Sequence, residues 1–180
     1  RGDALIITTD ASPWAIGGFL MVNGVITEYF HQAISPFDAD LMKIPLGSSD
    51  AQQGCEAFAL LVALRLWKRY WHNRRITLTV RSDSVSGLTV VLKLKSTGEA
   101  PSLIARELAV DLSRTTYLPA IVEHIPGVAN VVADILSMYD APAAAQPDQK
   151  KKDIPPCLVV ATLRICPPRP KSWWVSLAPP

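Results

Sequence analysis

Residues 4–18 read Ala-Leu-Ile-Ile-Thr-Thr-Asp-Ala-Ser-Pro-Trp-Ala-Ile-Gly-Gly. The first six are apolar or β-branched, a composition typical of a buried strand. Asp10 ends this run, and small residues follow through Gly17 and Gly18. A carboxylate at the end of a buried strand is costly unless it is paired or binds a cation. The stretch therefore predicts a strand that carries a functional carboxylate at its end.

Three more carboxylates stand in comparable settings. Glu56 opens an apolar, helix-like segment, and Asp83 closes a strand-like one. Asp134 lies within residues 126–137, which read Pro-Gly-Val-Ala-Asn-Val-Val-Ala-Asp-Ile-Leu-Ser. Four carboxylates from separate elements would form a set of hard oxygen ligands suited to Mg²⁺ or Mn²⁺.

Each carboxylate also has an ordinary structural explanation. Asp10 and Asp83 could cap turns at strand ends, which is a common role for aspartate. Glu56 could be a first-turn helix acid favoured by the helix dipole. Asp134 is harder to explain in this way, because aspartate has a poor propensity for helix interiors. The four residues together favour a metal site.

Local patterns predict a mixed α/β domain. Asn23 and Gly24 form a strong two-residue hairpin signal, because both residues tolerate positive φ. The alternation of strand and helix patterns implies a mixed sheet with helices on its faces. We expect strands over residues 4–10, 15–22, 25–31, 75–82 and 119–124, helices over 51–71, 85–94, 101–113 and 128–138, and a long irregular connection over 33–50.

Charge and proline content divide the chain in two. Residues 1–140 hold 12 basic and 14 acidic residues, so this part supplies no overall positive field. Residues 141–180 hold 6 basic and 2 acidic residues and 9 of the 15 prolines. We expect a main domain over 1–140 and a Pro-rich basic tail or linker over 141–180. Residues 157–163 could form a strand and the Trp173-Trp174 pair could dock, so the tail could be partly docked.

Other features exclude whole classes of protein. Charged residues interrupt the longest apolar stretch, so no segment reaches the roughly 20 uncharged residues of a membrane helix. The three cysteines lack paired metal-ligand spacing, which favours free thiols in a reducing compartment. The chain starts at Arg1, so we expect it to be a piece of a longer protein.

Four short motifs follow one another along the chain: Thr9-Asp10-Ala11-Ser12 with Gly17-Gly18, Glu56-Ala57 with Trp67, Ser82-Asp83-Ser84, and residues 126–137. In this combination and order they resemble the ribonuclease H family, in the form carried by retrotransposon-type reverse transcriptases. The likeness covers roughly residues 3–139. Met138 departs from it, because retroelement sequences commonly carry a basic residue there. Each motif alone is weak, and their order makes the combination specific.

The resemblance implies a ribonuclease H-like fold, with a five-stranded mixed sheet flanked by helices. It also implies two Mg²⁺ ions, for which Mn²⁺ could substitute. Asp10 would bridge both ions, and Asp134 would hold the ion that activates water. Glu56 and Asp83 would hold the ion on the leaving-group side. His124 would assist proton transfer or product release.

The same resemblance suggests substrate contacts and partners. Ser12, Gly17 and Gly18 would contact the RNA strand, and Asn130 would face the substrate or cap the last helix. The implied activity is hydrolysis of the RNA strand of RNA–DNA hybrids by residues 1–140. The expected partners are the hybrid and the polymerase region of the same polyprotein. We expect an intracellular protein, cytoplasmic or nuclear, that has no membrane partner and is a monomer as an isolated domain.

Two other functions remain open at this point. The chain could be a DNA-directed nuclease on the same fold, or a non-catalytic module that docks to nucleic acid or a polymerase. Residues 68–75 interleave basic and aromatic side chains and could touch phosphates. Such a run is more often the solvated end of a helix, which is the interpretation that we favour.

Overall fold

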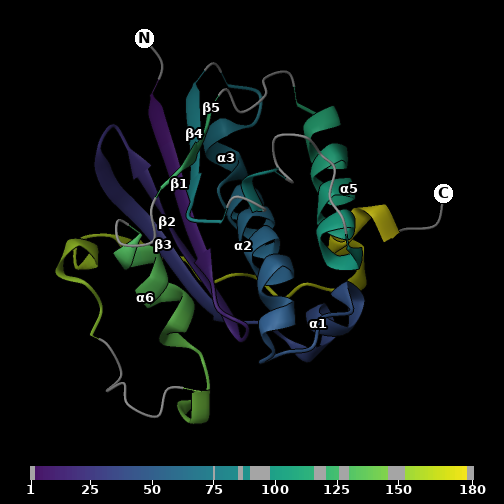
Figure 1. The fold of residues 1–180 in the computed structure, drawn as a ribbon. Coiled ribbons are helices and arrows are strands. Elements are labelled where there is room, and N and C mark those ends of the chain that lie inside the picture. Colours follow the sequence, from purple (N-terminus) through teal and green to yellow (C-terminus); the bar gives the residue numbers. More distant parts are fainter. Residues whose placement is uncertain are drawn as a thin grey trace.

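A mixed sheet forms the centre of the computed structural model (Figure 1). The structure describes residues 3–74, 76–84, 87–89, 98–115, 121–125, 130–145 and 153–177, with the backbone alone described over 121–124. The strand order is β5-β4-β1-β2-β3-β6. The strands are β1 (Ala4–Ala11), β2 (Ala15–Val22), β3 (Val25–Ala33), β4 (Thr77–Ser82), β5 (Ile121–His124) and β6 (Thr162–Leu163).

The sheet combines a hairpin meander with parallel strands. Strands β1, β2 and β3 pair antiparallel, whereas β4 pairs parallel with both β1 and β5. The β2–β3 turn places Asn23 at φ 50° and Gly24 at φ 86°, the positive values that a two-residue hairpin requires. The predicted five-stranded mixed sheet is confirmed, and the two-residue β6 adds a parallel sixth strand beside β3.

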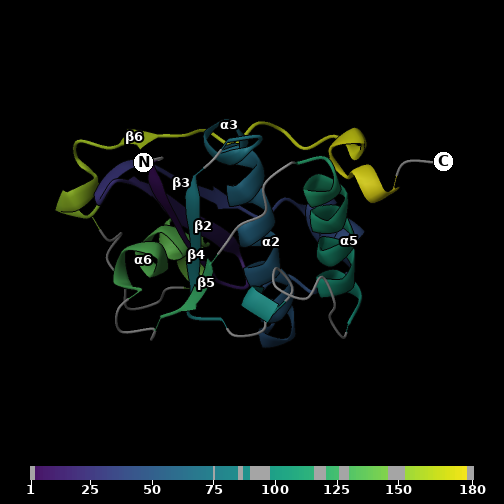
Figure 2. The same cartoon turned by 90° about the horizontal axis from the view of Figure 1, so that it is seen from above.

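Helices cover both faces of the sheet (Figure 2). Helix α2 lies on one face, with α5 packed against it, and α6 lies on the other face. Helix α2 is buried around most of its circumference, because its sequence is apolar on nearly every side. The helices are α1 (Pro36–Met42), α2 (Gln52–Leu66), α3 (Lys68–Trp71), α5 (Glu99–Ser113) and α6 (Val131–Tyr139), with short 3₁₀ turns η1 (Ser49–Ala51), η3 (Ala143–Ala145), η4 (Pro156–Leu158), η5 (Lys171–Trp173) and η6 (Val175–Leu177).

Two sequence predictions about helices need correction. Residues 33–50, predicted to be irregular, contain α1, which Ser35 caps by accepting a hydrogen bond from the Asp38 amide at 3.1 Å. Seven residues are too few to show a helical period. The helix predicted over 51–71 is interrupted at Trp67, where φ is −102°. Most of the helix predicted over 85–94 lies outside the described residues.

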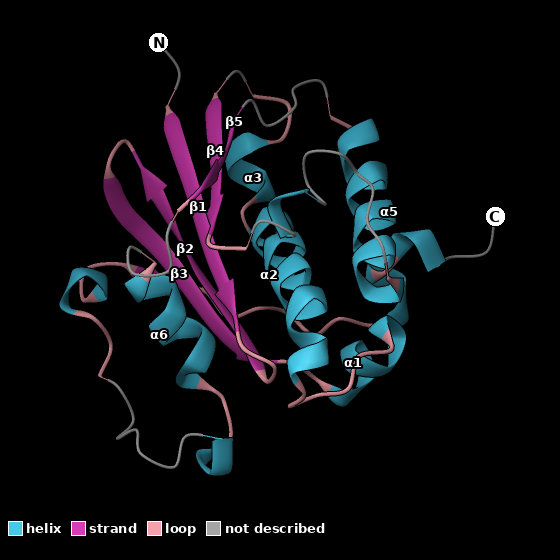
Figure 3. Cartoon of the chain, in the orientation of Figure 1, coloured by secondary structure: helices cyan, strands magenta, loops and turns pink. Residues whose placement is uncertain are grey.

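Residues 153–177 lie against the domain, as the yellow-green to yellow trace in Figure 2 shows, and the helical turns near the C-terminus are seen in Figure 3. This packing agrees with the partly docked tail that the sequence left open beside a free linker. Trp174 is fully buried and joins the main apolar core. The position of a domain boundary after residue 140 stays a prediction.

Among the described residues, no helix is both long enough and apolar enough to cross a membrane.

Candidate active site

The sheet brings two of the predicted carboxylates to the same edge. Strands β1 and β4 run parallel, and Thr8 lies opposite Arg81. Asp10 and Asp83 each follow two residues later, so both lie where these neighbouring strands end. Asp134 stands in the first turn of α6, which packs on β1 and β2. Strand pairing and helix packing thus bring Asp10, Asp83 and Asp134 toward one another.

The electrostatics of Asp10 reflect this convergence. Its side chain is buried, with 8% of the residue exposed. The pKa of Asp10 is raised from 3.8 to about 7, chiefly by burial and also by the negative charges of Asp83 and Asp134, against hydrogen bonds from the Ala11 amide and the Ser137 hydroxyl. Repulsion of this kind requires like charges close by. The structure therefore brings two of the other three carboxylates, Asp83 and Asp134, near Asp10.

Glu56 joins this end of β1 through a neighbour on its own helix. Gln52 donates from Nε2 to Glu56 Oε1 at 2.9 Å and to the Ala11 carbonyl oxygen at 2.7 Å. The amide thus connects helix α2 to the residue after Asp10. Sequence reasoning missed Gln52, although its spacing of four residues from Glu56 places both on one helix face.

The carboxylates form an open arrangement. Within the described ranges, no group of three or more His, Cys, Asp or Glu side chains is placed to hold a metal ion. Like charges repel, so carboxylates without a counter-ion are expected to stay apart. The chemistry of the donors nonetheless suits a hard divalent cation, because all four side chains offer carboxylate oxygens.

Ser137 links the carboxylates to the body of the fold. Its hydroxyl lies 3.2 Å from Asp10 Oδ2 and 2.9 Å from the Asp134 carbonyl oxygen, and it has one proton to donate to either. Ser12 in turn donates to the Ser137 carbonyl oxygen at 3.0 Å and accepts from the Ala15 amide at 3.1 Å. Ser137 belongs to the last sequence motif but was not predicted to be a site residue. Burial and bonding give Ser12 a structural role, and its contact with substrate stays a prediction.

Gly17 and Gly18 have packing reasons for lacking a side chain. A Cβ on Gly17 would lie 2.5 Å from the backbone of Leu136 in α6, and one on Gly18 would lie 2.7 Å from the Thr8 carbonyl oxygen. Gly17 therefore lets α6, and with it Asp134, approach the sheet. The predicted substrate contacts of both glycines remain untested.

Asn130 occupies the N-cap position of helix α6, but its side chain makes no capping hydrogen bond with the helix. The residue is 2% exposed, and its Nδ2 donates to the Thr9 carbonyl oxygen at 3.3 Å. Its Oδ1 and the Thr9 hydroxyl are buried without a hydrogen-bond partner among the residues that the structure describes. This bond joins the start of α6 to β1 next to Asp10, and a contact of Asn130 with substrate stays a prediction.

His124 lies at the same edge of the sheet as Asp83, whereas residues 68–75, the basic segment, lie elsewhere. His124 ends β5 and pairs with Ser82 of β4, and its side chain lies outside the described residues. Arg69 and Tyr70, in the basic segment, both donate to Glu28. At 1.5 Å rise per residue, this segment begins about 20 Å along the helices from Glu56. Arg69 is exposed and Trp71 is buried, which agrees with the solvated helix end that we favour.

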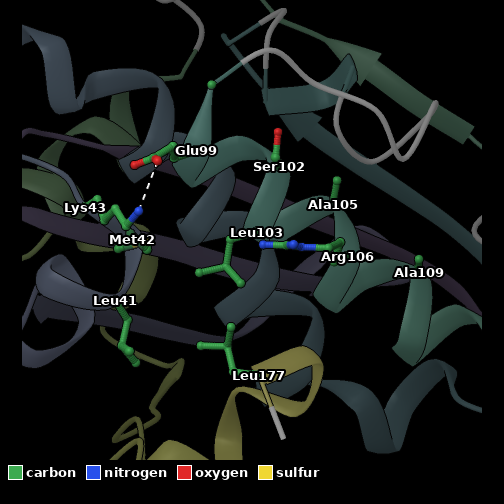
Figure 4. Close-up of a pocket in the computed structure, with 11 residues that line it drawn as sticks. Leu41, Met42, Lys43, Glu99, Ser102, Leu103, Ala105, Arg106, Ala109 and Leu177 are labelled. Atoms are coloured by element: carbon green, nitrogen blue, oxygen red, sulfur yellow. Dashed lines mark hydrogen bonds and ion pairs between the residues drawn. The ribbon is translucent and has the colours of Figure 1, made fainter. Parts of the chain in front are cut away.

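A groove of about 990 Å³ lies between α1, α5 and η6, and none of the four carboxylates lines it (Figure 4). An exposed ion pair of 3.0 Å between Lys43 and Glu99 stands at its rim. Leu103 and Leu177 are among the apolar residues on its walls. The groove therefore lacks the convergent buried polar groups that mark a catalytic centre.

Comparisons with known proteins bear on the fold. No model of a protein family matches the chain, and no curated protein matches it. Among solved structures, the chain is similar to RNase H1 from the halophilic archaeon Halobacterium salinarum NRC-1, with 19% sequence identity and a TM-score of 0.52. The match covers 78% of this chain and 100% of that one. The chain therefore has the ribonuclease H fold.

Proposed function

We propose that this protein is a metal-dependent endonuclease that hydrolyses the RNA strand of RNA–DNA hybrids. The observation that carries the proposal is the electrostatic state of Asp10, which is buried beside the like charges of Asp83 and Asp134. Such a group is stabilised by a bound cation. The likeness to a protein named RNase H1 supports the choice of substrate, although a fold alone does not determine function.

The four carboxylates Asp10, Glu56, Asp83 and Asp134 would hold two Mg²⁺ ions, or Mn²⁺ in their place. A pair of such ions activates a water molecule and neutralises the departing 3′-oxygen. Ser137 would orient the Asp10 carboxylate through its hydroxyl, and Gln52 would orient Glu56. His124, at the end of β5, would take or release a proton during turnover.

The wider context of the enzyme also belongs to the proposal. Residues 126–137 resemble the retroelement form of the last ribonuclease H motif, which favours a reverse transcriptase as the parent protein. Residues 1–140 carry no excess of positive charge, so the isolated domain should bind a hybrid modestly. A polymerase region of the same polyprotein would supply the remaining affinity.

One observation favours a second candidate, a non-catalytic module that docks to nucleic acid or a polymerase. In the described part of the chain, no group of carboxylates is placed to hold a metal ion. An enzyme of the proposed kind must close these side chains around its ions. A docking module would leave them apart.

Cleavage of an end-labelled RNA–DNA hybrid distinguishes the candidates. The purified full chain is given Mg²⁺, Mn²⁺ or chelator, beside Asp10→Asn and the matched control Asp40→Asn, which changes an exposed carboxylate. We expect metal-dependent cutting of the RNA strand only. The cleavage rate of Asp10→Asn should be lower by at least roughly 10³-fold, which is the upper range for deleting one electrostatic contact to a transition state. The control should keep the full rate.

Two results would contradict the proposal. A folded protein that binds the hybrid and never cuts it indicates the docking module. Equal cutting of double-stranded DNA indicates a DNA-directed nuclease.

A further inference from the structure

Residues 153–177, which we name the C-terminal strap, run from the outer edge of the sheet to helix α5 (Figure 2). At the edge, β6 pairs with β3, where Thr162 lies opposite Glu28. The Arg164 amide then donates to the Tyr29 carbonyl oxygen at 2.7 Å. The strap thereby covers part of a sheet edge, which would otherwise present unpaired backbone groups.

The first anchor of the strap is a buried ion pair with helix α1. Arg169 donates to Asp38 Oδ2 from Nε at 2.9 Å and from Nη2 at 2.8 Å. Its Nη1 donates to Gln32 Oε1 at 2.6 Å. The Arg169 and Asp38 side chains are 4% and 1% exposed. A charge buried to this degree needs its partner, so this contact is specific to the docked strap.

The second anchor surrounds Glu107 of helix α5, which is fully buried. The Val175 and Ser176 amides donate to its two carboxylate oxygens at 2.9 and 2.7 Å, and the Ser176 hydroxyl donates as well. Arg65 of α2 supplies the opposite charge at 2.6 Å. Three of these four donors therefore belong to the strap.

The third anchor is aromatic. Trp174 is fully buried and stacks on Phe58 of α2, with ring centroids 5.7 Å apart and an angle of 10° between the rings. Arg65 lies over the Trp173 ring at 4.3 Å and donates to the Trp173 carbonyl oxygen at 2.7 Å. Phe58 follows Glu56 by two residues, so the strap packs on the helix that carries a candidate site residue.

We propose that the strap is a permanent lock on helix α2, and that it unfolds together with the rest of the domain as one unit. A flexible linker would not bury a tryptophan, an arginine and two partner carboxylates at three separate places. This inference does not depend on the proposed catalytic function.

Hydrogen exchange on the full-length wild-type chain tests the lock directly. The strap amides of Arg164, Val175 and Ser176 donate to groups on the body, so they should exchange as slowly as amides of β3. Thermal unfolding should show a single transition. Exchange of these three amides at the rate of an unfolded chain, with β3 still protected, would overturn the proposal.

A double-mutant cycle tests the ionic anchor. Arg169→Met should lower the melting temperature by roughly 5–15 °C, because it leaves Asp38 without its buried partner. The melting temperature of the double variant, Arg169→Met with Asp38→Asn, should fall by less than the sum of the two single falls. Lys171→Met is the matched control, since it removes an exposed charge from the same strap and should shift the temperature little. Equal melting temperatures for Arg169→Met and Lys171→Met would contradict the lock.

Discussion

Two regions of the molecule bury carboxylates, and they balance the negative charge in different ways. Under the strap, Asp38 meets the Arg169 guanidinium at 2.8 Å, and Glu107 meets that of Arg65 at 2.6 Å. At the end of β1, Asp10 accepts from the Ser137 hydroxyl and faces two further carboxylates. The first region pairs each buried carboxylate with an arginine. The second places a buried carboxylate beside like charges.

The difference separates structural carboxylates from a candidate ligand set. A carboxylate that is paired with arginine contributes to the native fold, and its removal leaves a buried cation behind. A carboxylate whose pKa is raised by burial and by nearby negative charges destabilises the native state when it is ionised. Binding of a cation or a proton removes this destabilisation. The same chemical change, from carboxylate to amide, should therefore have opposite effects in the two regions.

The largest change in stability is expected for a carboxylate under the strap. Glu107→Gln should lower the free energy of unfolding by about 3–5 kcal/mol, because four donors lose a buried negative charge and Arg65 keeps only Asp111 as a carboxylate partner. Glu99→Gln is the matched control, since Glu99 pairs with Lys43 on the surface with 68% of its side chain exposed. That variant should lose at most about 0.5 kcal/mol. Denaturant unfolding measures both, and equal losses would remove the basis of the comparison.

Asp10→Asn should have the opposite effect on stability when no divalent metal is present. The raised pKa means that the native state holds its proton more tightly than the unfolded state. The contribution of Asp10 to stability is therefore full below about pH 4 and falls as the pH rises to about 7, by up to about 4 kcal/mol. Asp10→Asn lacks this titration, so at pH 8 it should be more stable than wild type. Parallel pH profiles for the two proteins would contradict the assignment.

A smaller effect is expected from Ser137→Ala. Its hydroxyl stabilises the ionised form of Asp10, so at pH 8 its loss should destabilise the protein by about 1 kcal/mol. In an Asp10→Asn background the loss should shrink, because the charge is gone. Ser113→Ala is the control, since that hydroxyl bonds the Val110 carbonyl oxygen at an exposed helix end. Denaturant midpoints of the variants give the comparison, and an identical loss in both backgrounds would show that Ser137 does not act on Asp10.

Periodic and turn signals made much of the fold predictable. The apolar run before Asp10, the Asn23-Gly24 turn and the apolar stretch around Asp134 predicted β1, the β2–β3 hairpin and α6 close to their observed bounds. The convergence of Asp10 with Asp83 followed from two strands that end in aspartate. Parallel pairing of β1 with β4 then explains why the two lie together.

The sequence raised docking of the strap only as one alternative, and the supporting contacts could not be predicted in this way. Helix α1 is too short to show a period, and the strap is a Pro-rich segment whose structure depends on tertiary contacts. Trp174 and Arg169 have no local pattern that indicates their partners. The hydrogen bonds of Gln52 and Ser137 likewise depend on how helices α2 and α6 pack on the sheet.

Thermal unfolding at pH 8, with Mg²⁺ or with chelator, tests most directly whether the buried carboxylates at the end of β1 take a divalent cation. The account predicts that Mg²⁺ raises the melting temperature of the wild-type chain by several degrees, as a ligand bound to the native state must. The rise in melting temperature should be small in Asp10→Asn and as large as in the wild type in the control Asp40→Asn. A wild-type melting temperature that is insensitive to Mg²⁺ would contradict it.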